Sequence, residues 1–247
     1  MKDVVECGPD AYEYFFNRSS VANIKFEDYR GINYCDWELT DVKKAEDKLM
    51  SIVGPENIYF VTKDFKGQGK DFIYFTSLSI HRPDIKDILE IGTGKGEMTN
   101  LFSKLWPDAN IITCDLSEDD ESYQELAIRK NDKQFFNKNI NQSNVKYINK
   151  NSFFLPEILK NKKFDFIFVD GGHDYPAVAW DIMYAYNHCK KDGYVFFHDV
   201  NEKKHDVFKV LKNIKKVIPE ILYILPSNNY ETWSGLTAWI KKGDLKK

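Results

Sequence analysis

The sequence has few of the features that mark several classes of protein. Its 247 residues include only four cysteines, Cys7, Cys35, Cys114 and Cys189, and no C-x-x-C pair. No apolar run approaches the ~20 residues that a membrane-spanning helix needs. The segment MKDVVECGPD lacks the apolar stretch of a secretory signal. These absences argue against a disulfide framework, a structural zinc site and a membrane partner, and we expect a cytoplasmic protein.

The sequence also lacks an excess of positive charge. Its 35 Lys and Arg against 38 Asp and Glu give a net charge of −3, which disfavours a surface adapted to nucleic acid. There is no internal repeat and no low-complexity linker. The apolar share of 43% and the length suit one α/β domain with an appendage.

Residues 1–80 differ in character from the rest of the chain. They are rich in aromatic side chains but show no alternation of strand and helix patterns. One helix is predicted there, ended by Gly54-Pro55, because apolar residues recur at helical spacing: Val42, Ala45, Leu49, Ile52 and Val53. We expect residues 1–80 to form a helical extension that caps the acceptor side of a second region, residues 81–247.

From about residue 85 the sequence alternates between short apolar runs and amphipathic helices. The runs at 88–91, 111–114, 164–169 and 194–197 fit strands that are covered on both faces. Helical stripes lie between and after them at 98–106, 178–189 and 207–218. This alternation predicts a doubly wound α/β fold with a mostly parallel, seven-stranded sheet, completed by a strand from residue 145 and an antiparallel edge hairpin of residues 221–225 and 236–240.

The most informative stretch is D-I-L-E-I-G-T-G-K-G-E-M-T, residues 87–99. A buried strand leads into a turn that contains Gly92, Gly94 and Gly96, and then into a helix. Glycines let the backbone turn sharply and let a ligand approach without a Cβ in the way. In doubly wound sheets, ligands bind at the carboxyl ends of the strands, which is where this turn is predicted to lie.

The glycine spacing distinguishes between two classes of cofactor. The dinucleotide pattern G-x-G-x-x-G would place its third glycine at position 97, which is Glu97, and a pyrophosphate there would meet an acidic side chain. The pattern is instead E-x-G-x-G-x-G, led by Glu90. It resembles the first motif of the class I S-adenosylmethionine-dependent methyltransferases. Their cofactor carries a sulfonium and an amino-acid end rather than phosphates.

The resemblance implies a set of cofactor-binding residues. Asp115 ends the next strand about 20 residues after the glycines, where a carboxylate accepts hydrogen bonds from ribose hydroxyls. The loop after the third strand is expected to reach the adenine, although many family members have aspartate where this chain has Asn151. The full expected set is Glu90, Gly92, Thr93, Gly94, Gly96, Asp115, Leu116, Asn151, Ser152 and Asp170.

Two further strand ends carry polar side chains. The fourth strand runs into D-G-G-H-D-Y and the fifth ends in F-H-D. Because parallel strands end at one edge of a sheet, we expect four side chains to converge near the reacting methyl group: Asp170, His173, His198 and Asp199. Over roughly residues 85–200, the two elements look like those of a subgroup that includes sugar- and antibiotic-tailoring O-methyltransferases.

The predicted catalytic residues are His173, Asp170 and Asp199. An imidazole titrates near neutral pH, so His173 is the candidate base; it is equally well interpreted as a residue that organises its loop. Several relatives hold Mg²⁺ in this place, and Asp170 and Asp199 are its candidate ligands. The third ligand is missing, because catechol-type enzymes have Asn where this chain has Val200. His198 is a poor Mg²⁺ ligand and is expected to pack at the strand end and orient Asp199.

The sequence therefore predicts an S-adenosylmethionine-dependent O-methyltransferase that acts on a hydroxyl of a small molecule, such as a sugar or a precursor of a surface glycan or natural product. An RNA or protein methyltransferase is a second hypothesis, disfavoured by the acidic net charge and by the lack of an N-P-P-Y segment after the fourth strand. A third is a module that binds the cofactor without catalysis. We expect a small-molecule acceptor and no nucleic-acid partner, and the sequence leaves a homo-oligomer open.

Overall fold

The computed structural model describes residues 4–6, 42–53, 69–117, 120, 133–200, 205–220, 222–224 and 238–243. Its strands are β1 (Val4–Glu6), β2 (Asp87–Ile91), β3 (Asn110–Asp115), β4 (Val145–Asn149), β5 (Phe164–Val169), β6 (Cys189–Phe197), β7 (Leu222–Ile224) and β8 (Ala238–Lys241). Its helices are α2 (Val42–Val53), α4 (Gly69–His81), α5 (Glu97–Leu105), α6 (Lys133–Ile140), the 3₁₀ turn η5 (Ser152–Phe154), α7 (Leu155–Leu159), α8 (Ala177–His188) and α9 (Val207–Ile214).

The strands form one sheet in the order β1-β7-β8-β6-β5-β2-β3-β4. Of the described strands, only β8 runs against its neighbours, β6 and β7; all other pairs are parallel. The chain leaves β2 toward β3 and β4 on one side, and later returns to β5 on the other side. The β2–β5 boundary is therefore the point at which the strand order reverses, and ligands of doubly wound sheets bind there.

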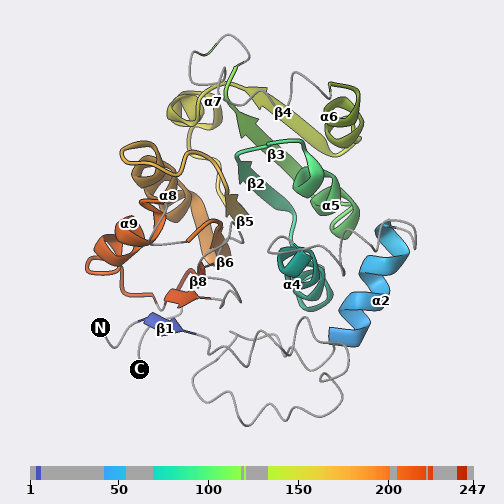
Figure 1. Ribbon diagram of the computed structural model, residues 1–247, viewed down its shortest axis with the longest axis horizontal. Coiled ribbons are helices and arrows are strands. Elements are labelled where there is room, and N and C mark those ends of the chain that lie inside the picture. Colours follow the sequence, from blue (N-terminus) through green and yellow to red (C-terminus); the bar gives the residue numbers. More distant parts are fainter. Residues whose placement is uncertain are drawn as a thin grey trace.

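Helices cover both faces of the sheet, as the doubly wound prediction requires (Figure 1). One core lies under α2, α4 and α5, and the other under α7, α8 and α9. In β5, Phe166 and Phe168 belong to the first core and Ile167 and Val169 to the second, because neighbouring side chains of a strand point to opposite faces.

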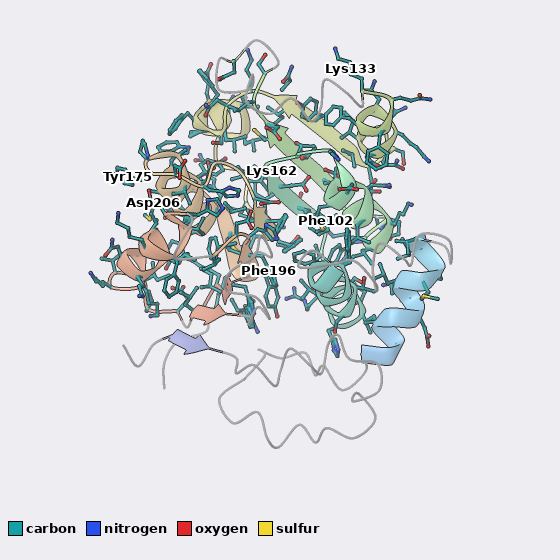
Figure 2. All side chains as sticks on the ribbon, in the orientation of Figure 1. Phe102, Lys133, Lys162, Tyr175, Phe196 and Asp206 are labelled. Atoms are coloured by element: carbon teal, nitrogen blue, oxygen red, sulfur yellow. The ribbon has the colours of Figure 1, made fainter. Side chains whose placement is uncertain are left out.

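Helix α4 packs directly on the sheet. The ring of Phe75 lies 5.1–5.5 Å from four others, those of Phe102, Phe166, Phe168 and Phe196. Figure 2 labels Phe102 and Phe196, which come from α5 and from β6. The expected boundary between residues 80 and 81 falls at the end of this helix, and α2 packs on its outer side (Figure 1).

The structure corrects two expectations about the fold. Among the described residues the sheet has eight strands rather than seven, because Val4–Glu6 pairs with β7 and so covers the expected edge hairpin. Cys189 fits the apolar stripe of the preceding helix, but its backbone is extended and it begins β6. The predicted helix at 42–53 is confirmed, whereas most of residues 1–80 lies outside the described part of the chain. Within the described ranges, no helix combines the length and apolar character needed to cross a membrane.

Candidate active site

Three backbone hydrogen bonds align the strand ends at one edge of the sheet. The N–H of Gly92 donates to Cys114 O at 2.8 Å, that of Asp170 to Ile91 O at 2.7 Å, and that of His198 to Val169 O at 2.9 Å. Each bond continues the parallel ladder one residue beyond a strand. Gly92, Asp170 and His198 therefore lie next to one another at the point of strand reversal.

A different structural reason explains each of the three glycines in the turn. All have a positive φ, which favours glycine. A Cβ on Gly92 would lie 1.9 Å from Asp170 O, so the crossing of two backbones requires glycine there. A Cβ on Gly96 would meet Asn139 Cβ at 2.9 Å and Ile140 Cγ2 at 3.0 Å in α6. A Cβ on Gly94 would have no neighbour within 4 Å, so its surroundings are open to a ligand.

The carboxyl group of Glu90 lies beneath the turn, fully buried. Its Oε2 accepts hydrogen bonds from the hydroxyl groups of Thr99 in α5 and, at 2.6 Å, Thr113 in β3, whereas Oε1 is buried without a partner. Burial raises the pKa of Glu90 to about 8, so this carboxyl is mostly protonated at neutral pH. Glu90 therefore joins two strands to a helix through its hydrogen bonds with Thr99 and Thr113.

Asp115 is placed as the sequence predicts, at the end of β3 beside the glycine turn. Its Oδ2 accepts from Gly94 N at 2.9 Å and its Oδ1 from Leu116 N at 2.7 Å. Thr93 is buried, and its hydroxyl lies 2.7 Å from that of Thr113. The structure thus brings Thr93, Gly94, Asp115 and Leu116 together at one strand end.

Asn151 and Ser152 follow β4 on the same edge. The side chain of Asn151 accepts from Phe153 N at 3.0 Å and caps η5, which fixes the loop. Asp181 in α8 lies behind this loop, 2% exposed and with Oδ1 unpartnered; burial raises its pKa to about 6. A Cβ on Gly171 would lie 2.9 Å from Asp181 Oδ2, so Asp181 explains the glycine after Asp170.

Four polar side chains converge beyond β5 and β6, as predicted. His198 Nδ1 lies 3.1 Å from Asp170 Oδ1 and 3.3 Å from Asp199 Oδ2. His173 Nε2 lies 3.1 Å from Asp199 Oδ2 and 3.7 Å from Asp170 Oδ1, yet it is buried without a well-formed hydrogen bond. Asp199 has φ +51°, a left-handed conformation that aspartate tolerates better than most residues. Two imidazole nitrogens thus face the same two carboxylate oxygens.

These contacts stabilise the ionised carboxylates of Asp170 and Asp199 and the protonated form of His173. Burial opposes the ionisation of Asp170 and Asp199, but His198 and His173 outweigh it and hold both carboxyl pKa values below their usual range. Burial likewise opposes protonation of His173, but the two carboxylates raise its pKa to about 9. The cluster can therefore hold a proton or another cation between its carboxylates.

Sequence analysis missed two partners of the cluster. The ring of His205 lies 4.4 Å from that of His173, centre to centre. Asp206 accepts from Tyr175 N at 3.1 Å and donates its own N–H to His173 O at 3.1 Å; Figure 2 labels Tyr175 and Asp206. These bonds hold the loop after β5 against the segment before α9. No spacing pattern links the two segments in the sequence, so only the fold could reveal them.

Mg²⁺, the ion that the resemblance implies, fits the donor atoms of this cluster poorly. Mg²⁺ prefers oxygen ligands in octahedral geometry, whereas an imidazole nitrogen lies between the two candidate carboxylates. Val200, at the expected third position, is buried in the second apolar core and supplies no ligand.

Comparison with known proteins agrees with this fold. A family model described as "Methyltransferase domain" matches residues 89–200. The O-methyltransferase TomG of Streptomyces achromogenes, solved in complex with SAM, superposes with a TM-score of 0.52 at 15% identity, over 84% of this chain and 97% of that one. A putative O-methyltransferase from Klebsiella pneumoniae gives 0.51 at 15% identity, over 95% and 99%.

An uncharacterized protein of Acanthamoeba polyphaga mimivirus is 30% identical over 138 residues, which are 54% of this chain and 59% of that relative. The chain thus matches about three fifths of this relative's length. The solved structures support the fold, and the family model covers the strands that carry the glycine turn and the polar cluster. Residues 89–200 thus resemble a methyltransferase domain, and the chain has a class I methyltransferase-like α/β fold.

Proposed function

We propose that this enzyme transfers a methyl group from S-adenosylmethionine to a hydroxyl of a small molecule, with a sugar or a glycan or natural-product precursor as the acceptor class. The observation that carries the proposal is the convergence of His173, His198, Asp170 and Asp199 beside the glycine turn. A module that only bound the cofactor would have no need for four interacting polar side chains at this edge. Two similar structures are described as O-methyltransferases, which supports oxygen as the acceptor atom.

Each end of the cofactor has proposed partners. The open surroundings of Gly94 leave room for the amino-acid end, and Asp115 is placed to accept hydrogen bonds from the ribose hydroxyls. Asn151 and Ser152 lie at the next strand end and are proposed to contact the adenine. Asp170 belongs to the cluster and its backbone also packs against Gly92, so it would border both the cofactor and the acceptor.

In the proposed reaction, the acceptor oxygen attacks the methyl carbon in line with the carbon–sulfur bond. The new carbon–oxygen bond forms while the carbon–sulfur bond breaks, and its electron pair leaves with sulfur to give neutral S-adenosylhomocysteine. The hydroxyl proton passes to the neutral imidazole of His173, which is a minor form at neutral pH because the carboxylates raise its pKa to about 9. Asp170 and Asp199 stabilise the imidazolium that forms, as a carboxylate does for a catalytic histidine.

A methyl-transfer screen tests this function. Nucleotide sugars and small alcohols are incubated with the enzyme and S-adenosylmethionine that carries a labelled methyl group, and label in the acceptor is counted. We expect His173→Ala to lower turnover by about 100-fold or more and to leave S-adenosylhomocysteine affinity unchanged. His188→Gln, in a histidine remote from the cluster, is the control and should retain full turnover. Unchanged turnover in His173→Ala would rule out its role as the base.

A further inference from the structure

The cluster contains three donor atoms that are arranged around one point. Asp170 Oδ1, His198 Nδ1 and Asp199 Oδ2 lie within 4.8 Å of one another. His198 is only 8% exposed, and its Nδ1 lies 3.1 Å and 3.3 Å from the two oxygens. Nδ1 of His198 hydrogen-bonds Asp170 Oδ1 and lies within ion-pair distance of Asp199 Oδ2, so one nitrogen faces both oxygens.

Two of the three separations among these atoms match those between ligands of a small divalent ion. Donors bound at about 2.1 Å are separated by roughly 3.0 Å in octahedral and roughly 3.4 Å in tetrahedral geometry. The two nitrogen–oxygen distances fall inside this interval. An ion could therefore bind all three atoms with small side-chain movements, and two carboxylates would neutralise its charge.

The chemistry of the donors selects the kind of ion. Imidazole suits the later first-row metals, and carboxylate suits Mg²⁺, Ca²⁺ and Mn²⁺, so a mixed set favours an ion that accepts both. The remaining groups at the cluster are also imidazoles: His173 Nε2 lies 3.1 Å from Asp199 Oδ2, and His205 stacks on His173. His173, His205 and Asp199 form a second group of donors within the same 4.8 Å limit. Imidazole nitrogens of both His198 and His173 therefore lie close to the Asp199 carboxylate.

We propose that Asp170, His198 and Asp199 bind a divalent transition-metal ion, of the series from Mn²⁺ to Zn²⁺, in preference to Mg²⁺. The ion's place beside the acceptor rests on the proposed function, but its binding does not. His173 stays outside the three-donor set, so it remains available to the acceptor proton. The three donors occupy one side of the ion, and the other side is left for oxygen atoms of an acceptor or of water.

The test measures binding of the ion itself. The full-length protein is dialysed against a chelator and then titrated with MnCl₂, CoCl₂, ZnCl₂ or MgCl₂ in a calorimeter, without cofactor. We expect one Mn²⁺, Co²⁺ or Zn²⁺ per chain, each bound at least about tenfold more tightly than Mg²⁺. Bound Co²⁺ should also show visible absorption that is altered by loss of the imidazole.

Substitution of the single nitrogen donor makes the test specific. His198→Glu leaves only oxygen donors, and we expect the preference over Mg²⁺ to fall to about threefold or less. His198→Asn replaces the imidazole nitrogen by a neutral amide oxygen, and should weaken the binding of Mn²⁺, Co²⁺ and Zn²⁺. His188→Gln, outside the cluster, is the matched control and should bind as the natural protein does. Circular dichroism confirms that each variant is folded.

The outcomes separate this proposal from the proposed function. Equal affinity for Mg²⁺ and Mn²⁺ would overturn the proposed preference. No ion binding by folded protein would overturn the metal site itself and would identify the cluster as an ion-pair network without metal. If S-adenosylhomocysteine still bound in that case, the cofactor site would stand. If the ion bound but S-adenosylhomocysteine did not, the metal site would stand and the proposed function would fail.

Discussion

Gly94 and Gly96 lie two residues apart and serve different purposes. The Cβ of an alanine would find open space at Gly94 and two close carbon atoms of α6 at Gly96. Position 94 is thus constrained by its φ of +53° and by what approaches it, whereas position 96 is constrained by helix packing. The proposed cofactor contact at Gly94 would therefore add a ligand requirement to the folding requirement at Gly96.

Substitution separates these two requirements. We expect Gly96→Ala to lower the free energy of unfolding by about 2–4 kcal/mol, through both its left-handed φ and the clash, and Gly94→Ala by only about 1–2 kcal/mol. Gly94→Leu should reduce S-adenosylhomocysteine affinity at least about tenfold while the protein stays folded. Denaturant titration and calorimetry measure the two effects. Equal destabilisation by both alanines would contradict the assignment.

Glu90 gives a pH-dependent prediction. Its pKa is raised from 4.5 to about 8 in the folded state, so below pH 4.5 the group is neutral in both states, and above it only the unfolded state ionises freely. The stability that Glu90 contributes is therefore lost progressively as pH rises through this window. Relative to Glu90→Gln, the natural protein should lose on the order of a few kcal/mol between pH 5 and pH 8.5. Parallel stability profiles of the two proteins would show that Glu90 is already ionised in the fold.

At the scale of elements, α4 is part of the sheet's packing. The Phe75 ring contacts rings from α5, β5 and β6, so this single side chain joins a helix to three elements. We expect Phe75→Ala to cost about 3–5 kcal/mol of stability, measured by chemical denaturation. Phe154→Ala removes the same atoms from a ring that is 51% exposed and should cost far less. Similar losses in both variants would mean that α4 is not anchored in this way.

Some elements of the fold could be predicted from the sequence, and others could not. The central strands and α5 follow from local patterns, since a buried parallel strand and an amphipathic helix each leave a periodic signal. The proximity of the polar residues after β5 and β6 could be predicted, because parallel strands end at the same edge of a sheet. The pairing of β1 with β7 and the contact of His205 with His173 could not, because both join segments far apart in the chain without any repeating pattern.

At the scale of the whole molecule, the two ends of the sheet have different tasks. At the amino ends of the strands, Lys190 Nζ lies 2.8 Å from Asp87 and 3.0 Å from Asp165, whose Oδ2 also accepts from Lys86 N and Asp87 N. These bonds join β2, β5 and β6. At the carboxyl ends, polar groups instead face one another in a cluster that can take a cation or a proton. The ion pairs that join the strands thus lie at one edge of the sheet, and the polar cluster of the proposed site lies at the opposite edge.

The central claim is that the edge between β2 and β5 holds S-adenosylmethionine and not a dinucleotide. Titration of the protein with S-adenosylhomocysteine, with NAD⁺ as the comparison ligand, tests it most directly. We predict saturable binding of one S-adenosylhomocysteine per chain in the micromolar range and no binding of NAD⁺, because Glu97 begins the helix where a pyrophosphate would lie. Absence of S-adenosylhomocysteine binding at millimolar concentration, or equal affinity for NAD⁺, would contradict the account.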